Sequence, residues 1–353
     1  MARNLVRTVL VCALGISLAL PMPPVQAAPR CLGKAATVVG TSRGERLRGT
    51  SRGDVIVARG GDDLIRSGGG KDRVCAGSGD DVILMGAGKD LAEGQLGSDF
   101  MAGGPARDRL VGGGGDLDVI RGNQGNDILL GASGLDILLG ESGNDRVDGG
   151  EGLFDRASFF FAPGPVSADL NTGLATGDGT DTLANVEDLE GSQHGDTLIG
   201  NAVDNFFFPL AGDDAVTGGD GFDLVSFFGA PGPVTADLTA GTATGDGNDT
   251  LVTIEDLVGA SHGDSLTGDA NANVLLGFEG NDSLFGMDGD DFLDGGTETD
   301  TLDGGNHVNG DQCVNGETVS NCELGAARAA SKVDPRSPSP TRPVLLATGG
   351  RRP

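Results

Sequence analysis

Aspartates recur at nine-residue intervals along much of the chain. One series runs from Asp54 to Asp108, and a second runs from Asp118 to Asp145 after a one-residue insertion between Gly112 and Asp116. In the most regular stretch, Gly122 to Asp148, each unit has Gly at its first and fourth positions, Asp at its sixth and an apolar residue at its eighth. Glycine permits the positive φ that lets a six-residue turn curl and point its carbonyls inward. Carbonyl and carboxylate oxygens are the ligands that Ca2+ takes, so the spacing predicts calcium binding in the turns.

Short strands must separate these turns. The last three residues of each unit are expected to form a strand whose eighth-position side chain enters the core. Two units make one coil of roughly 18 residues with a turn on each side, and the strands of successive coils pair in parallel. Alternate units then stack, Asp63 over Asp81 on one edge and Asp72 over Asp90 on the other. The eighth position is apolar in twelve units: Leu47, Ile56, Ile65, Val74, Ile83, Ala92, Met101, Leu110, Ile120, Leu129, Leu138 and Val147.

The first units depart from the pattern. They carry Arg43 and Arg52 where the second structural Gly is expected, and Glu45 stands in place of Asp. We therefore expect a capping turn with poor metal sites at this end. At the other end of the regular array, Asp155 comes one residue late.

Two copies of a longer unit follow. Residues Phe154 to Asn205 match Phe222 to Asn273 without a gap, at an offset of 68. Each copy holds a non-repeat insertion, Arg156 to Asp181 in the first and Leu224 to Asp249 in the second. Alternating apolar residues followed by Gly predict a small hairpin in each insertion, beginning at 166–170 and 234–238. After each insertion the nine-residue phase returns, through Glu187, Asp196, Asn205, Asp214 and Asp223 and through Glu255, Asp264, Asn273, Asp282, Asp291 and Asp300.

The charge of the chain is strongly acidic. Its 353 residues include 52 Asp plus Glu against 24 Lys plus Arg, for a net charge of −28. Between Ala157 and Ala327 there are 31 acidic residues and no Lys or Arg. Nucleic acid is excluded as a default partner because phosphate binding needs a basic surface. Two carboxylates about 4 Å apart repel by roughly 4 kcal/mol at an effective dielectric near 20, so stacked Asp rows favour bound divalent cations.

Both ends have features of an exported protein. Arg3 and Arg7, an apolar run at 8–20 and small residues before Ala27 predict a signal peptide at 1–27, and no later run is long enough for a membrane helix. Four cysteines then remain. Their positions favour the disulfides Cys31–Cys75 and Cys313–Cys322, one near each end of the array, although three pairings are possible and a zinc site competes with them.

Over nearly all of Gly40 to Asp303 the chain resembles the RTX, or haemolysin-type, calcium-binding repeat proteins. The resemblance implies an all-β parallel β-roll that binds several Ca2+ ions in its glycine-rich turns and folds on binding them. It departs from family members that leave the cell with an uncleaved C-terminal signal. The ligand role carries over to units with both Gly and Asp in place, which leaves out Asp118, Asp155 and Asp300. The expected metal ligands are Asp63, Asp72, Asp81, Asp90, Asp99, Asp127, Asp136, Asp145, Asp214, Asp223, Asp282 and Asp291. Some of these side chains could instead only hydrogen-bond the turn backbone.

The expected organisation has six parts. A signal peptide at 1–27 precedes an N-terminal RTX β-roll with its capping turn at 28–155. The first long unit covers 156–223, and the second long unit with the C-terminal repeats covers 224–303. A cystine-stapled end cap at 304–323 precedes a disordered basic tail at 324–353, with six basic residues and five prolines.

Evidence for catalysis is weak in this sequence. Gly40–Gly44 and Gly49–Gly53 match the Gly-x-Ser-x-Gly pattern of hydrolases, but no helical pattern follows either of them. His194 and His262 hold equivalent places in the two long units and are expected to be structural. Three Phe clusters, at 159–161, 206–208 and 227–228, favour core packing over a carbohydrate platform. We therefore expect a secreted, non-enzymatic protein.

The expected partners are calcium ions and cell-surface or extracellular glycans or proteins. The alternative is a polysaccharide lyase or another extracellular enzyme on a β-helix scaffold. A lyase would need basic residues to offset uronate charge, and the long array at 157–327 has none.

Overall fold

The protein is a β-solenoid without helices in its described part. The structure, a computed structural model, describes residues 29–307 and 310–322. Every regular element there is a β-strand, and coil-to-coil pairing is parallel outside the two insertions, which confirms the all-β parallel fold. No helix that could cross a membrane occurs within these residues. The predicted signal peptide and basic tail lie outside the described residues.

Each coil contributes one strand to each of two faces. Residues 18 apart pair, as Leu64 does with Val82 and Val55 with Arg73. The one-residue insertion is absorbed within β11 (Arg109–Gln124), where pairing with β12 (Ile128–Ser142) shifts between Gly114 and Leu117. These two long strands run through a turn and contribute to both faces.

The first face, called face A, is parallel throughout. It begins with β4 (Arg46–Arg48), β6 (Leu64–Gly70), β8 (Val82–Gly88) and β10 (Phe100–Pro105), and continues through the C-terminal parts of β11 and β12. It ends with β14 (Arg156–Ser158), β18 (Asp188–Glu190), β20 (Phe206–Phe208), β22 (Leu224–Ser226), β26 (Asp256–Val258), β28 (Val274–Leu276), β30 (Phe292–Asp294) and β32 (Gln312–Val314).

The second face, called face B, contains the insertions. Its stacking order is β3 (Val38–Val39), β5 (Val55–Gly60), β7 (Arg73–Ser78), β9 (Leu91–Leu96), the N-terminal parts of β11 and β12, then β13 (Arg146–Gly152), β17 (Thr180–Ala184), β16 (Leu174–Thr176), β15 (Ser167–Asp169), β19 (Thr197–Ile199) and β21 (Ala215–Thr217). It continues with β25 (Asn248–Val252), β24 (Thr242–Thr244), β23 (Thr235–Asp237), β27 (Ser265–Thr267), β29 (Ser283–Phe285), β31 (Thr301–Asp303) and β33 (Thr318–Ser320).

The predicted core positions are confirmed. From Ile56 to Val147, the eighth-position side chains are at most 3% exposed and form one continuous cluster along the solenoid axis, against which Leu47 packs. A strand of three residues can bury only its middle side chain between the faces, because neighbouring side chains point to opposite sides of a sheet.

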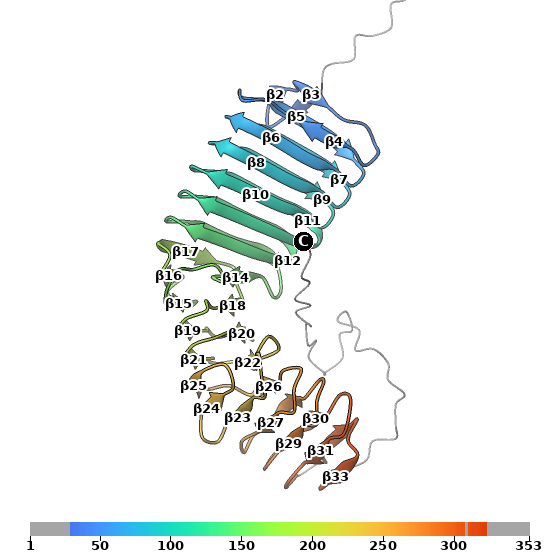
Figure 1. The fold of residues 1–353 in the computed structure, drawn as a ribbon, viewed down its shortest axis with the longest axis vertical. Coiled ribbons are helices and arrows are strands. Elements are labelled where there is room, and N and C mark those ends of the chain that lie inside the picture. The colour runs from blue at the N-terminus through green and yellow to red at the C-terminus, as the bar shows by residue number, and fades with distance from the viewer. Residues whose placement is uncertain (1–28, 308–309, 323–353) are drawn as a thin grey trace, which may run out of the picture.

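Both predicted hairpins are present, and they lie within the sheet. β15 pairs antiparallel with β16, and β16 with β17, so this meander separates β13 from β19 on face B. The second copy repeats the arrangement with β23, β24 and β25. On face A, β14 pairs directly with β18 and β22 with β26. Face B therefore gains two strands per insertion that face A lacks, which adds roughly 10 Å at 4.8 Å per strand. Figure 1 shows the solenoid bent, with the inserted strands on the convex side.

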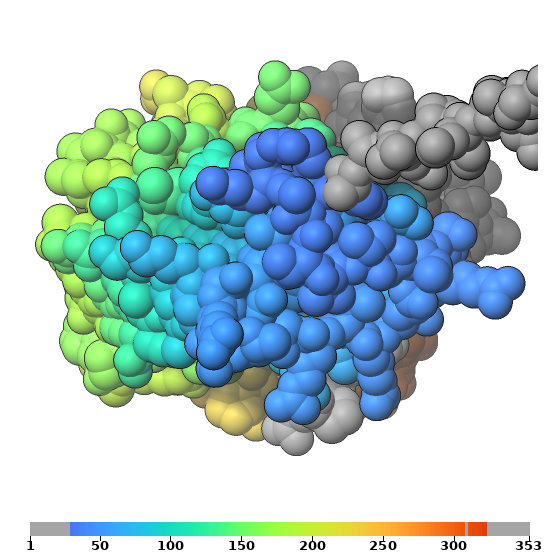
Figure 2. Space-filling view, turned by 90° about the horizontal axis from the view of Figure 1, so that it is seen from above, coloured from blue at the N-terminus to red at the C-terminus, as the bar shows by residue number. Residues whose placement is uncertain are grey.

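Both predicted disulfides are confirmed. Cys31 joins Cys75 with a Cα–Cα distance of 5.6 Å, and Cys313 joins Cys322 at 5.9 Å. The first ties the antiparallel pair β1 (Arg30–Cys31) and β2 (Lys34–Ala35) to the solenoid. Figure 2 shows these N-terminal residues, in dark blue, lying across the end of the molecule. The open strand edges of a solenoid are sites of unwanted pairing, and such caps cover them.

Candidate metal centre: two kinds of glycine-rich turn

The sixth-position carboxylates form two ladders, one along each edge of the solenoid. In each ladder, Oδ1 accepts the backbone N–H of the sixth-position residue one coil earlier. Asp127 donates in this way to Asp145 at 2.6 Å, and Asp118 donates to Asp136 at 3.0 Å. Asp63 likewise donates to Asp81 at 2.7 Å. The predicted stacking of alternate units on opposite edges is therefore confirmed.

The second carboxylate oxygen differs from the first. In most of these aspartates, Oδ2 is buried and has no hydrogen-bond partner among the described residues. We call such turns open turns. A buried acceptor without a partner is costly, so each one marks a place where a donor or a cation is needed. The aspartates of this kind are Asp63, Asp72, Asp81, Asp90, Asp99, Asp108, Asp118, Asp127, Asp136, Asp145, Asp214, Asp249, Asp282, Asp291 and Asp300.

Electrostatics disfavour the ionised form of these carboxylates in the metal-free protein. Burial, reinforced by the neighbouring carboxylates of the ladder, raises the pKa to about 7 in Asp99, Asp108, Asp136, Asp145, Asp214 and Asp282. Burial raises the pKa of Asp81, Asp90, Asp127 and Asp291 to about 6. A bound cation would reverse this balance, since it favours the charged form.

The donor set fits calcium better than a metal held by side chains alone. No three side chains of His, Cys, Asp or Glu converge on one point in the described part of the chain. Transition metals in proteins take mainly His and Cys ligands, whereas Ca2+ takes oxygens, including backbone carbonyls. A buried carboxylate oxygen at the end of a glycine-rich turn meets the calcium requirement, with the turn backbone as the source of further oxygens.

A second kind of turn satisfies its own carboxylate. In these self-capped turns, the side-chain oxygen of the sixth residue accepts the N–H of the residue four earlier. Ala260 donates to Asp264 Oδ2 at 2.5 Å, and Thr50 donates to Asp54 Oδ2 at 2.7 Å. The other self-capped turns end at Glu45, Asp196, Asn205 and Asn273. Burial acts to raise the pKa of Asp54, but hydrogen bonds from Thr50 outweigh it and lower that pKa.

Backbone conformation separates the two kinds of turn. In most open turns the second and fourth residues have positive φ, as in Ala132 (87°) and Gly134 (133°) before Asp136. In the turns that end at Asp118 and Asp249, only the second residue has it. The self-capped turns have no positive φ at either position. The expectation of positive φ at the first Gly is wrong, because Gly131 and its equivalents are not in that region. Most open turns have Gly at the fourth position, and Gly adopts positive φ at almost no energetic cost. This accounts for most of the difference in conformation between the two kinds of turn.

All twelve expected ligands lie in ladder positions. Eleven belong to open turns on the Oδ2 criterion, and the twelfth, Asp223, accepts the N–H of Asn205 at 2.8 Å. Sequence reasoning missed Asp108, and it left out Asp118 and Asp300, which have the same arrangement. It also missed Asp181 and Asp249, which accept the N–H groups of Asp145 and Asp214 across the insertions. The signal was present, because Gly179-x-Asp181-x-Leu183 and Gly247-x-Asp249-x-Leu251 repeat the fourth, sixth and eighth positions.

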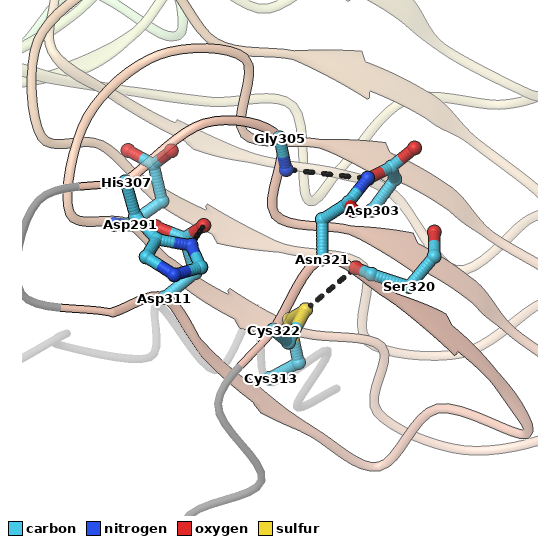
Figure 3. Close-up of a disulfide and its surroundings, with 9 residues drawn as sticks. All are labelled: Asp291, Asp303, Gly305, His307, Asp311, Cys313, Ser320, Asn321 and Cys322. Carbon is cyan, nitrogen blue, oxygen red and sulfur yellow. Dashed lines mark hydrogen bonds and ion pairs between the residues drawn. A yellow bond between two sulfur atoms is a disulfide. The ribbon is translucent and has the colours of Figure 1, made fainter.

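The remaining candidate residues lie mostly in self-capped turns. His194 and His262 occupy the fourth position of two such turns, and Ser42 and Ser51 occupy the third position of two others. Neither Gly-x-Ser-x-Gly segment is followed by a helix. At the last described turn of one edge, His307 Nδ1 lies 3.0 Å from Asp311 Oδ2 (Figure 3), so a side chain here meets the oxygen that open turns leave unpartnered.

Core packing is confirmed for only part of the Phe clusters. Phe206, Phe207, Phe208 and Phe227 are buried. The expectation is wrong for Phe160 and Phe161, which are 41% and 53% exposed. Arg121 lies over the Phe161 ring, 4.5 Å from its centroid.

Comparison with known families gives one match. The model of the RTX calcium-binding nonapeptide repeat matches residues 48–83, 86–116, 121–152, 190–225, 258–293 and 276–307, which together cover more than half of the chain. The matches omit both inserted meanders and both ends of the chain. No curated protein matches the chain.

Proposed function

The chain belongs to the RTX calcium-binding nonapeptide repeat family, and we propose that its open turns are the calcium sites while its self-capped turns bind none. The observation that carries this assignment is the buried, unpartnered Oδ2 of the open turns. The proposed ligands are the open-turn aspartates, which are eleven of the twelve expected from the sequence together with Asp108, Asp118, Asp249 and Asp300. Asp223, the twelfth, is proposed from its ladder position. Turns that end at Glu45, Asp54, Asp196, Asn205, Asp264 and Asn273 are excluded, because their side-chain oxygens already accept a hydrogen bond from their own turn.

Calcium binding is coupled to folding in this proposal. The ladder brings carboxylates of successive coils together and buries them, which opposes folding at neutral pH. In each open turn, Oδ1 accepts a backbone N–H of the preceding coil, and Oδ2 is the proposed ligand of the cation. A cation that binds only the folded chain stabilises it by RT ln(1 + [L]/Kd), and several such sites act together.

We further propose that the protein is secreted, has no catalytic activity and serves an extracellular interaction. The predicted signal peptide and two disulfides support export, since disulfides persist in oxidising compartments. Both Gly-x-Ser-x-Gly segments belong to self-capped turns, where the serine has no strand-to-helix elbow to expose it.

Calcium titration of the full chain tests the proposal. The β signal in circular dichroism is expected to be largely absent in EGTA and to develop cooperatively as Ca2+ is added, and calorimetry is expected to show several ions bound per chain. Magnesium at the same concentration serves as the control, because it demands a tighter octahedral site. A spectrum that is the same in EGTA and in Ca2+, with no heat of binding, would rule the proposal out.

A further inference from the structure

The turns along one edge of the solenoid change the sign of their charge from one end to the other. We call this the A-to-B edge, because its turns lead from face A to face B. Its first four turns each expose one basic side chain and hold no acid besides the ladder residue. Several of its later turns expose acids, and the chain has no Lys or Arg between Ala157 and Ala327. The exposed bases are Arg52, Lys71, Lys89 and Arg107, and the exposed acids are Asp213, Glu279, Glu298 and Glu317.

The middle of this edge carries little net charge. Asn126 and Asn144 hold the fifth turn position there, which Lys89 holds in an earlier turn. Glu141, an acid in this central part, is paired with the guanidinium of Arg121. The A-to-B edge therefore has a basic end, a nearly neutral centre and an acidic end.

An exposed aromatic pair lies in the same central part. Phe160 and Phe161 belong to the segment that joins β14 to β15, and their rings meet edge to face with centroids 5.0 Å apart. They are 41% and 53% exposed. In the second long unit, Gly229 replaces Phe161, and Phe228 packs against Phe278 instead. The exposed pair is therefore specific to the first unit, at the centre of the edge.

The aromatic pair lies close to the midpoint of the A-to-B edge. Six strands of face A, β4, β6, β8, β10, β11 and β12, precede β14, and seven, from β18 to β32, follow it. The turn with Lys71 follows the fifth strand before β14, and the turn with Glu279 follows the fifth strand after it. Arg52 and Glu298 are matched in the same way at the sixth strand on either side. The opposite charges are thus arranged symmetrically about the aromatic pair.

The other edge has no such order. Arg43 and Arg59 are exposed there, but the exposed acids Asp62 and Asp80 follow them directly. Asp62 Oδ1 accepts the N–H of Asp80 at 3.1 Å, so this acid also stabilises the neighbouring turn. Within the described residues, only the A-to-B edge separates a basic half from an acidic half.

The basic row is unfavourable in an isolated copy of the protein. Lys71, Lys89 and Arg107 occupy equivalent positions in successive coils, whose strands lie about 4.8 Å apart. None of the three forms an ion pair with a described residue. Like charges at this spacing repel, and a surface that presents acids along the row would relieve the repulsion. The acidic half of the same edge in a second copy is such a surface.

We propose that two copies of the chain associate side by side and antiparallel through the A-to-B edge, with a twofold axis at Phe160 and Phe161. In a twofold interface each patch meets its counterpart in both directions. Lys71 then lies opposite the partner's Glu279 and Arg52 opposite the partner's Glu298, and each pairing occurs twice. The aromatic pairs of the two copies pack together at the centre, where most of the binding energy of an interface is concentrated. This association goes beyond calcium binding and gives the protein a partner of its own kind.

The bend of the solenoid is compatible with this arrangement. The inserted strands make face B longer than face A, so the molecule curves toward face A (Figure 1). A twofold axis that runs from face A to face B reverses the chain direction in the second copy and keeps the direction of its curve. Fourteen strand spacings and the distance between packed sheets give the edge roughly 65 Å by 10 Å. About 650 Å² buried on each copy falls within the range of stable interfaces.

Sedimentation of the folded, calcium-loaded full chain tests the association. The parent is expected to form a dimer at micromolar concentration in about 50 mM NaCl. The dimer is expected to weaken at least about tenfold in about 500 mM NaCl, because salt screens exposed charges. A parent that stays monomeric at both salt concentrations, or a dimer that salt does not affect, would overturn the proposal without any variant.

Charge reversal identifies the contacts. Arg52→Glu with Lys71→Glu places acids opposite acids, and Glu279→Lys with Glu298→Lys places bases opposite bases. Each double variant alone is expected to dimerise at least about tenfold more weakly than the parent, since facing like charges are unfavourable. An equimolar mixture of the two is expected to form a heterodimer with the affinity of the parent, because every reversed charge again faces an opposite one. A mixture that stays monomeric would disprove the antiparallel register.

Arg43→Glu with Arg59→Glu is the matched control on the other edge. It changes the net charge by the same amount, and its dimer is expected to equal that of the parent. Equal weakening in this control would trace the effect to net charge and overturn the assignment of the edge. A monomeric parent that binds heparin, and loses that binding in Arg52→Glu with Lys71→Glu, would overturn it as well by assigning the basic turns to a polyanion. Circular dichroism and calcium calorimetry of every variant distinguish a failure of the dimer from a failure of the calcium sites.

Discussion

The turns that end at Asp136 and Asp264 have the same length and the same last side chain, yet they use that side chain differently. Asp136 Oδ1 accepts the N–H of Asp118 in the preceding coil, and its Oδ2 has no hydrogen-bond partner among the described residues. Asp264 Oδ1 accepts the N–H of Val234, and its Oδ2 accepts the N–H of Ala260 in the same turn. The fourth residue is Gly134 in the first turn and His262 in the second. Backbone conformation at the second and fourth positions therefore separates a turn that satisfies its own carboxylate from one that leaves Oδ2 for a cation.

Acidification in the absence of calcium should give the largest effect, because it neutralises the open-turn carboxylates together. Open-turn carboxylates have a folded pKa of about 7 against an ordinary value of 3.8, as in Asp136 and Asp282. A raised folded pKa means that the folded chain favours the protonated carboxyl group. The stability that these groups contribute is therefore fully present below about pH 4, and it is lost as the pH rises through 7 and they ionise. In EGTA, we expect β signal in circular dichroism to be low at pH 7.5 and to increase on titration to pH 4. A chelated protein that stays unfolded at pH 4 would show that carboxylate ionisation is not what opposes folding.

Asp136→Asn should weaken one calcium site while keeping the ladder. The amide oxygen can still accept the N–H of Asp118, but the anionic ligand is gone. Calorimetry is expected to show about tenfold weaker binding at one site, or one ion fewer, with the β signal retained in excess Ca2+. Asp264→Asn is the matched control in a self-capped turn, and an equal loss of calcium there would remove the distinction between the two kinds of turn.

Asp264→Ala should lower stability and leave calcium binding unchanged. Two buried backbone N–H groups, those of Val234 and Ala260, lose their acceptor, at a cost of about 1–3 kcal/mol each. Denaturant unfolding in saturating Ca2+ measures the loss, and calorimetry measures the ion count. A reduced ion count with unchanged stability would contradict the assignment.

Ser42→Ala should have no measurable effect. Ser42 is exposed in a self-capped turn whose hydrogen bond comes from Thr41 to Glu45. Calcium affinity and unfolding midpoint are expected to match the parent. A hydrolase activity in the parent that is abolished by this change would instead establish an enzyme.

Much of this molecule could be predicted from the nine-residue period. The period alone places Leu129 and Leu138 in the core and puts Asp127 and Asp136 on opposite edges. The disulfides were favoured on another ground, the positions of the cysteines near the two ends of the array. It could not show that Oδ2 of Asp264 is satisfied, because that depends on the φ of residues whose types overlap between the two turns. Ala260 and Ala132 both hold the second position, and only Ala132 has positive φ.

The insertions were harder to predict for a different reason. The 68-residue offset identifies a duplication, but it does not tell whether a hairpin projects or joins the sheet. Whether the hairpin joins the sheet depends on the strands next to it. β13 pairs with β17 on one side of the meander, and β19 pairs with β15 on the other. The role of Asp181 followed from that placement, although its motif was visible in the sequence.

The ladder also has a direction. Each sixth-position N–H is accepted by the carboxylate that comes one coil later in the chain, as Asp63 by Asp81 and Asp81 by Asp99. A coil therefore cannot complete its own hydrogen bonds until the next coil has been delivered. If the chain is exported N-terminus first, the most recently exported coil would lack the hydrogen bonds to the next coil throughout export. Assembly would then be completed by the last coil to arrive, the one closed by Cys313 and Cys322.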